Sequence, residues 1–503
     1  METLNKKKDG YSSRFGLLMV MVGGSVGTGN LWRFPRLVCT YGGAFVIAAV
    51  ISLLIIAIPL VMVENFAGRA SRHSAPGAFR DLLGSKWTIM GTFATLCYFM
   101  MHCNYTVILA WVVRYLFMSI TGSYFGVEDK LELFTNVASA DWGTAVCWLV
   151  PMALVFFCTN RQGFLEKTAK FIVPIMLVIL VGLACYSMTQ PGAVEGLKYS
   201  FGFEFSELLN ANIWIQAITQ DFWSLGSGTM LCVTLSKYSA KKEDIVVNTN
   251  VQGFGDVSFA MLGTLVVLPC IFTFAGSTEE ALELAQSGNN GVTFVGLTNL
   301  FETLPMGRVI GTLFFLSLAF AAFTSIIAVT TVFAGPFIDM GWSRKKCIAG
   351  AIFFQVLLGF PSFMNQDILT NQDTTWGFGI FIGGMFSGIL AMKFGARKIR
   401  EKFINPVSDR KITRAFDIKA GYIAPIVSGV VLLVWLKDAI GWDEQWWNPF
   451  RTESVGTLLF QWAVGFVVAY FFAKKFNKDT IGVYYDPDKE EFPEIPDRIM
   501  DEV

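Results

Sequence analysis

The sequence predicts an all-α polytopic membrane protein with twelve transmembrane helices. Of its 503 residues, 53% are hydrophobic and only 16% are charged, whereas a soluble domain carries about 25% charged residues. Apolar runs of about 20 residues, each long enough to cross the ~30 Å hydrocarbon core of a bilayer, recur along the chain. These observations exclude a soluble enzyme, a disordered chain and a coiled coil. The 39 basic and 39 acidic residues balance, which argues against a nucleic-acid partner.

Twelve spans account for the apolar runs, and their length favours helices. Barrel strands would instead alternate apolar and polar residues over about ten positions. The spans are predicted at residues 14–38, 43–66, 90–119, 142–159, 168–188, 212–236, 246–275, 308–338, 346–363, 375–394, 421–440 and 455–473. We expect a single transmembrane domain over 1–475 and a short cytoplasmic tail over 476–503.

The lysines and arginines between the spans orient the chain in the membrane. The N-terminal segment and the loops that follow even-numbered spans are basic, most strongly between residues 397 and 419. The opposite loops hold fewer basic residues and are mostly acidic. Because cytoplasmic loops are enriched in lysine and arginine, both termini are predicted to be cytoplasmic.

Two of the spans contain clusters of glycine and polar residues at mid-depth. The first holds four glycines and three polar residues within 23–30, and the sixth reads Ser-Leu-Gly-Ser-Gly-Thr over 224–229. Glycine costs ~1 kcal/mol relative to alanine inside a helix, so these segments favour local unwinding. Unwound backbone at membrane depth must line a cavity or be buried in protein. The alternative is close packing of unbroken helices through small residues.

The positions of the two interrupted spans suggest an internal repeat. They are five spans apart, so 14–188 and 212–394 form two halves of opposite orientation, followed by two helices over 421–473. Inverted repeats of this kind place a site at the bilayer midplane, between the broken helices. Half-helix N-termini attract a carboxylate and half-helix C-termini attract cations, which suits an amino acid carried with sodium.

The run GTGNLWRFP over residues 27–35 resembles the first-helix signature of neurotransmitter:sodium symporters, the LeuT-type family. The resemblance continues through 41–45, 59–60, 64–69, 220–226 and 323–325, and it covers about residues 8–475. It implies a LeuT-type 5+5 inverted repeat with broken helices 1 and 6, in the inner membrane of a bacterium. It also implies sodium-driven symport of an amino acid by alternating access.

The family pattern, carried over residue by residue, implies two sodium sites. The site distant from the substrate would use the carbonyls of Gly23, Val26 and Ala321 and the hydroxyls of Thr324 and Ser325. The substrate-linked site would use Ser25, Asn30, Ser224, Asp256 and the substrate carboxylate. The family usually has Asn at the position of Asp256. The alternative for Thr324 and Ser325 is a pair of hydroxyls bonded back to their own helix.

Other positions match the substrate-binding residues of the family. Tyr105 would donate a hydrogen bond to the substrate carboxylate, and Gly27 stands where carriers of monoamines have an aspartate, which favours an amino acid. The predicted set is Gly24, Ser25, Thr28, Gly29, Met101, Tyr105, Trp223, Ser224, Gly226, Thr229, Ser325, Ala328 and Val329. Its glycines open volume and its larger side chains are apolar, which predicts a large hydrophobic or aromatic substrate.

Two charged pairs match the gates of the family, one on the outer path and one on the inner path with two tyrosines beside it. The outer pair would be joined through water. In order, the gate residues are Arg33 and Asp373, then Lys8 and Asp339 with Tyr11 and Tyr238. Exposed ion pairs are worth under ~1 kcal/mol, which suits contacts that break in every transport cycle.

Asp256 also bears on the need for chloride. Two sodium ions beside a zwitterion leave positive charge in a low-dielectric site, where isolated charge is costly. Animal members of the family balance this charge with a bound chloride, and a fixed carboxylate at Asp256 can replace it. We therefore expect two Na⁺ and no chloride. The alternatives are that Asp256 is only a sodium ligand, or a helix-capping carboxylate that faces the cytoplasm.

Other assignments remain open. A non-transporting amino-acid sensor on the same fold is the alternative function. An enzyme is disfavoured because the chain has no His-Glu-x-x-His motif, and a channel is disfavoured because the polar breaks are confined to two helices. His102 and Asp221 are ionisable groups within spans, and no role is assigned to either. Besides the amino acid, the expected partner is membrane lipid, and the oligomeric state is open.

Overall fold

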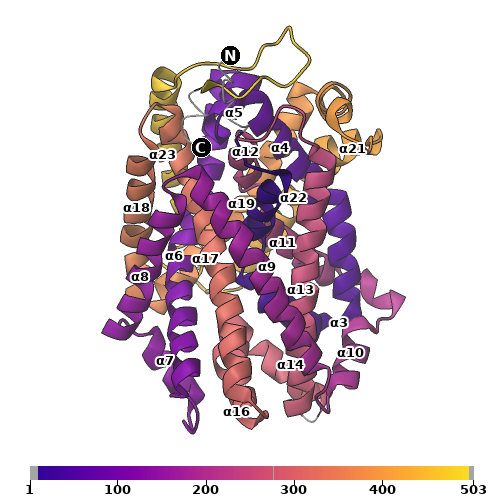
Figure 1. The fold of residues 1–503 in the computed structure, drawn as a ribbon, viewed down its shortest axis with the longest axis vertical. Coiled ribbons are helices and arrows are strands. Elements are labelled where there is room, and N and C mark those ends of the chain that lie inside the picture. The colour runs from indigo at the N-terminus through magenta and orange to yellow at the C-terminus, as the bar shows by residue number, and fades with distance from the viewer. Residues whose placement is uncertain (1–9, 276, 498–503) are drawn as a thin grey trace, which may run out of the picture.

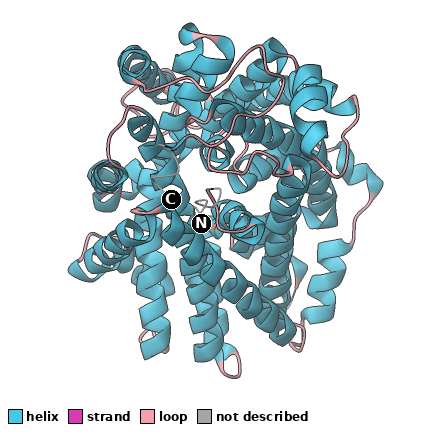
Figure 2. Ribbon diagram, turned by 45° about the horizontal axis from the view of Figure 1, so that its top comes forward, coloured by secondary structure: helices cyan, strands magenta, loops and turns pink. Residues whose placement is uncertain are grey.

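The computed structural model describes residues 10–275 and 277–497, which form a bundle of α-helices joined by loops and shorter helices (Figures 1 and 2). Within these ranges there is no strand, which confirms the predicted all-α class. Ten helices in the described chain are long and apolar enough to cross a membrane. They are α3 (Arg33–Ser52), which continues through η1 (Leu53–Ala57) into α4 (Ile58–Ser71), α6 (Thr88–Thr121), α8 (Trp142–Thr159), α9 (Gln162–Ser187), α13 (Ile245–Ala275), α17 (Gly307–Asp339), α18 (Arg344–Met364), α19 (Gln366–Phe394), α22 (Ala424–Ala439) entered through η7 (Lys419–Ile423), and α23 (Val455–Asp479).

The first and sixth predicted spans are both broken, which is why they are missing from these ten. Their pieces are α1 (Arg14–Ser25) and α2 (Thr28–Leu31) in the first, and α11 (Ala211–Leu225) and α12 (Leu231–Ser236) in the sixth. Between α11 and α12, Gly226, Gly228 and Met230 have φ angles of 79°, 81° and 63°. Residues other than glycine rarely adopt this left-handed backbone conformation, so the glycines of the sixth span permit the break.

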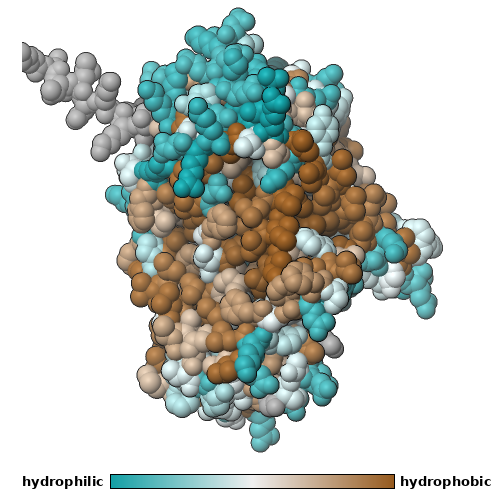
Figure 3. All heavy atoms as spheres, turned by 90° about the vertical axis from the view of Figure 1, so that its right-hand side faces the viewer, coloured by the Kyte–Doolittle hydropathy of each residue, from teal (hydrophilic) through white to brown (hydrophobic). Residues whose placement is uncertain are grey.

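Shorter helices gather at the two ends of the bundle, and an apolar band separates these ends. One end carries α7 (Lys130–Ala138), α10 (Ala193–Phe201), η3 (Phe205–Leu209), α14 (Thr278–Gln286), α15 (Gly288–Asn290), η4 (Gly291–Gly296) and α16 (Leu297–Thr303). The other carries α5 (Ala75–Leu83), η2 (Ser85–Trp87), α20 (Ala396–Lys398), η5 (Ile399–Ile404), η6 (Asn405–Val407) and α21 (Ala415–Ile418). Figure 3 shows hydrophobic atoms across the middle of the face it draws and hydrophilic atoms at its top. This distribution fits a bilayer around the middle of the bundle.

Three helices that hold predicted functional positions, α6, α17 and α19, are the most enclosed of the ten. In α6, 78% of the most apolar window is buried, and in α17 and α19 the share is 72%. In α23 the corresponding share is only 33%, so this helix lies at the periphery. The helix α6 packs against α17, α19, α18 and α8, and it therefore forms the centre of the bundle.

The segment that follows α23 lies against the transmembrane helices. The Arg72 side chain donates a hydrogen bond to the carbonyl of Pro493 at 2.7 Å, and the Ile481 N–H donates to the carbonyl of Asp339 at 3.2 Å. Phe492 is buried. Residues 481–493 thus contact α4 and α17 at the end of the molecule that carries α5.

Candidate functional site

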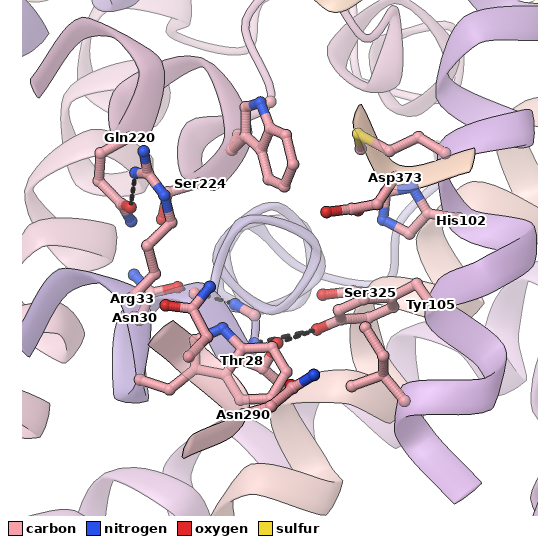
Figure 4. Close-up of a pocket in the computed structure, with 18 of the residues that line it drawn as sticks. Thr28, Asn30, Arg33, His102, Tyr105, Gln220, Ser224, Asn290, Ser325 and Asp373 are labelled. Carbon is pink, nitrogen blue, oxygen red and sulfur yellow. Dashed lines mark hydrogen bonds between the residues drawn. The ribbon is translucent and has the colours of Figure 1, made fainter. Parts of the chain in front are cut away.

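A cavity of about 320 Å³ lies between the two helix breaks and the helices α6, α17 and α19 (Figure 4). Ten of the thirteen predicted substrate-binding residues line it. These ten are Gly24, Ser25, Thr28, Gly29, Met101, Tyr105, Trp223, Ser224, Gly226 and Ser325. The two unwound segments therefore do line a cavity, and they are not simply places where unbroken helices pack closely.

Three predicted substrate-binding residues, Thr229, Ala328 and Val329, lie outside this lining. The Thr229 hydroxyl donates to the carbonyl of Gly226 at 2.6 Å and closes the unwound turn on itself. Ala328 lies behind Gly24, and a Cβ placed on Gly24 would be 3.4 Å from that of Ala328. Val329 is fully buried. The lining of this cavity therefore does not include these three residues, and their assignment to the substrate site stays a prediction.

Thr28 and Tyr105 form a group of hydroxyl and amide dipoles at one side of the cavity. The Tyr105 hydroxyl accepts a hydrogen bond from the N–H of Thr28 at 3.0 Å and lies 2.8 Å from the Thr28 hydroxyl. Figure 4 shows these two side chains meeting at the cavity. Each hydroxyl has one proton, so while the two are bonded to each other one of them is able to donate to a carboxylate oxygen. The pair is thus suited to hold the carboxylate of a ligand.

Asp256 lies beside this group, in a cluster contributed by α2, α11 and α13. Its Oδ1 atom accepts hydrogen bonds from the Ser224 hydroxyl at 2.7 Å and from the Asn30 amide at 2.8 Å. Asp256 is 3% exposed and lies in the interior of α13, so it is not a helix-capping residue. Carboxylate, amide and hydroxyl oxygens are the ligands that hard cations prefer. The residues present fit a sodium ion.

Gln252 contributes to the same region, although the sequence motifs did not include it. It lies one helical turn before Asp256 on α13, and its amide donates to the Ser25 hydroxyl at 2.7 Å. The same amide lies 3.4 Å from the carbonyl of Leu225, the last residue of α11. Gln252 therefore connects the ends of the two broken helices, α1 and α11. The spacing of four residues from Asp256 is the signal that could have identified it.

The distal sodium positions also come together, from α1 and α17. Thr324 faces Gly23, since a Cβ on that glycine would lie 3.8 Å from the Cβ of Thr324. The hydroxyls of Thr324 and Ser325 donate to the carbonyl of Ala321 at 3.0 and 3.1 Å. Three of the five proposed oxygens thus converge at one place. Because a hydroxyl that donates within its helix keeps its lone pairs, these bonds are compatible with cation binding.

Arg33 lies in the same cavity, but its hydrogen bonds differ from the expected ones. Its guanidinium donates to Gln220 at 2.6 Å and to Gln216 at 2.8 Å, one helical turn apart on α11. Asp373 lines the cavity too, and Figure 4 shows it across from Arg33. The predicted link between Arg33 and Asp373 through water stays a prediction. Beyond these residues the cavity continues to Ser287–Asn290 at α15.

The opposite path is closed by packed side chains. Tyr11 and Tyr238 are 8% and 1% exposed, and Asp339 is fully buried. The Asp339 carboxylate lies 3.2 Å from the ammonium group of Lys237, an ion pair that the motifs did not indicate. Lys8, the predicted partner of Asp339, lies outside the described residues. Among the described residues, the cavity lining extends to α15 and includes none of Tyr11, Lys237, Tyr238 and Asp339.

Asp221 is buried away from the cavity. Its carboxylate accepts a hydrogen bond from the hydroxyl of Ser52 on α3, and it is not part of the cavity lining. His102, the other ionisable group without an assigned role, does line the cavity.

Comparisons with known proteins agree with this architecture. The family model of the sodium:neurotransmitter symporter family matches residues 8–127 and 123–477. An uncharacterized sodium-dependent transporter of Methanocaldococcus jannaschii is 29% identical over 451 residues, which cover 85% of this chain and 90% of the relative. A second uncharacterized sodium-dependent transporter, from Haemophilus influenzae, is 26% identical over 465 residues, covering 87% of this chain and 100% of the relative.

A solved structure shares the fold. The crystal structure of MhsT in complex with L-phenylalanine superimposes with a TM-score of 0.74 at 27% sequence identity, and the match covers 85% of this chain and 99% of MhsT. These relatives are transporters and not enzymes, and they support a multi-pass membrane protein that depends on sodium. The family model covers most of the chain and the fold is of the LeuT type, so the protein belongs to the sodium:neurotransmitter symporter family.

Proposed function

We propose that the protein is a sodium-driven symporter of a large hydrophobic or aromatic amino acid, which it carries by alternating access without a need for chloride. One observation carries the proposal. A cavity between two broken helices has the Thr28–Tyr105 hydroxyl pair beside the buried cluster of Asn30, Ser224 and Asp256. The first group suits a carboxylate and the second suits a cation.

The closeness of the two groups provides the coupling. Thr28 and Asn30 are two residues apart in α2, so a carboxylate held by Thr28 would lie near a cation held by Asn30. The carboxylate would complete the oxygen shell of the ion, and each would raise the affinity for the other by the same factor. Substrate and sodium would then bind and leave together.

The walls of the cavity support a bulky substrate. Gly24 and Gly226 leave space, and Met101, Ile108 and Trp223 supply apolar surface. A volume of about 320 Å³ is within the range of pockets that enclose small ligands, ~300–1,000 Å³. MhsT, which shares the fold, was solved with L-phenylalanine. This neighbour supports an aromatic side chain in the corresponding cavity.

The proposed independence of chloride follows from Asp256. Two sodium ions and a zwitterion carry two positive charges in excess, and a buried charge without compensation is very costly. Asp256 supplies one fixed negative charge within the cluster. This carboxylate would take the place of a bound anion, and two sodium sites remain the proposed stoichiometry.

The open and closed paths support an outward-facing state. The cavity reaches α15, whereas Asp339 and Lys237 lie buried beyond its inner end. The loops at this inner end include the basic segment 397–419. We therefore propose that the inner end, with both chain termini, faces the cytoplasm. Opening this end and closing the outer one would release substrate inside.

Uptake by purified protein in liposomes tests the function. An inward sodium gradient should drive accumulation of a radiolabelled hydrophobic amino acid, and competition by all twenty amino acids should rank bulky ones first. Replacing chloride by gluconate should leave the rate unchanged. The sensor hypothesis predicts binding without transport, so absence of both accumulation and counterflow would favour it.

A further inference from the structure

His102 is a titratable residue of the cavity that the proposed function does not use. It lies on α6, directly after Met101 and three residues before Tyr105, and it is 7% exposed. Figure 4 shows its ring at the cavity beside Asp373, and no hydrogen bond joins these two residues. A side chain in this place can contact the substrate directly.

The hydrogen bond at one nitrogen determines what the other nitrogen can do. Nδ1 of His102 lies 3.0 Å from the carbonyl oxygen of Tyr98, on the same helix. A carbonyl oxygen only accepts, so Nδ1 carries the proton of this bond. In the neutral imidazole, Nε2 then has a free lone pair and acts as an acceptor.

The surroundings favour the neutral ring. The rings of Tyr98 and Tyr105 lie with their centroids 4.5 and 5.2 Å from the centroid of His102, both edge to face. Burying a charged group among apolar rings is costly. The imidazole therefore presents a lone pair rather than a second N–H to the cavity.

Nε2 has no protein partner within the described residues. It makes no hydrogen bond there, and it is not among the polar atoms that are sealed off inside the protein. Nε2 is thus an accessible acceptor in a cavity that is lined by the apolar side chains of Met101, Ile108 and Trp223 and by the carboxylate of Asp373.

We propose that His102 Nε2 accepts a hydrogen bond from the substrate side chain, so that the preferred substrate is an aromatic amino acid carrying a donor. Tryptophan offers its indole N–H and tyrosine its hydroxyl. This inference rests on the proposed amino-acid transport and names the substrate class. Phenylalanine and leucine would leave the acceptor unpaired, and a site built to pair a polar group rejects analogues that lack it. His102 is in this sense a specificity-determining residue.

A matched pair of ligands isolates this hydrogen bond. In L-3-benzothienylalanine a sulfur replaces the indole N–H of tryptophan at nearly the same size. The inhibition constants of the two compounds are measured in competition for sodium-driven uptake, and their ratio is taken within each variant, so that losses in expression cancel. Wild type should prefer tryptophan by about three- to tenfold, the range that one net hydrogen bond supplies.

Two variants separate hydrogen bonding from packing. His102→Phe keeps an aromatic ring but removes the acceptor, and its ratio should fall to about one. His102→Gln offers an amide oxygen and should recover part of the preference. If His102→Phe does not fold, the ratios of the wild type and of His102→Gln still show whether His102 accepts a hydrogen bond from the substrate.

The possible failures are distinguishable. A wild-type ratio of one, or an unchanged ratio in His102→Phe, overturns the role of His102 while leaving amino-acid transport intact. Uptake of leucine with no preference for tryptophan has the same meaning. Absence of sodium-driven uptake of all twenty amino acids overturns the proposed function and this inference with it.

Discussion

The substitution Asp256→Asn tests whether one buried carboxylate replaces chloride. The change removes a negative charge and keeps the size of the side chain. The remaining amide oxygen can still accept from Ser224 and Asn30, which now bond to Oδ1 of Asp256 at 2.7 and 2.8 Å. The fold should therefore be preserved, and the effect should arise from the lost charge.

The size of the effect follows from the burial of Asp256, which is 3% exposed. Two unit charges about 4 Å apart interact by ~4 kcal/mol at an effective dielectric constant of about 20. Because 1.4 kcal/mol is a factor of ten, the loss corresponds to nearly three orders of magnitude in sodium affinity. The asparagine oxygen remains a ligand and offsets part of this. We expect the sodium concentration for half-maximal uptake in gluconate to rise at least about 100-fold.

The assay compares uptake in chloride and in gluconate for each variant. The uptake rate of the wild type should be the same in both anions. The uptake rate of Asp256→Asn should be at least about tenfold higher in chloride than in gluconate. Asp221→Asn is the matched control, because Asp221 is also a buried acid but accepts its hydrogen bond from Ser52 and not from Asn30 or Ser224. A strict chloride requirement in wild type would refute the reasoning, as would normal sodium affinity of Asp256→Asn in gluconate.

Three further predictions concern other parts of the mechanism. The double substitution Thr324→Ala and Ser325→Ala removes two proposed sodium ligands and should abolish sodium-driven uptake while thermal stability stays within a few degrees; normal uptake would exclude the distal site. Lys237→Gln leaves the Asp339 carboxylate buried without this cation, at a cost of about 3–5 kcal/mol to the closed inner path. Labelling of cysteines placed along that path should therefore rise, and an unchanged labelling rate would contradict this. Gly228→Ala introduces a Cβ only 2.4 Å from the Gly384 nitrogen, on backbone with a φ of 81°, so the melting temperature of the purified protein should fall, and an unchanged melting temperature would show that the turn adapts.

Much of the fold follows from local properties of the chain. The length of each apolar run predicted the spans, because a helix must be long enough to cross the hydrocarbon. The glycines at 226 and 228 predicted the break between α11 and α12, since few other residues adopt their backbone angles. The sequence motifs likewise indicated Asn30, Ser224 and Asp256, which the structure brings together.

Contacts between distant helices were harder to predict. Gln216 and Gln220 lie on one face of α11, but nothing in their spacing indicates that this face meets Arg33. Ala328 was expected in the cavity wall, but it is not part of the lining. It packs near Gly24 together with Leu231 of α12. The orientation of a short helix after an unwound segment depends on tertiary packing, which a periodic pattern does not report.

The C-terminal segment has a consequence for the energetics of the transport cycle. It contacts Arg72, the residue that follows α4, and the backbone of Asp339 on α17, so it bridges the ends of these two helices. If α4 and α17 separate at this end, residues 481–493 must either detach or move with only one of the two helices. In the alternating-access cycle proposed above, the binding free energy of this segment would add to the barrier for opening the end of the molecule that carries α5. Shortening the chain before Ile481 would lower that barrier and leave the outer binding steps unaltered.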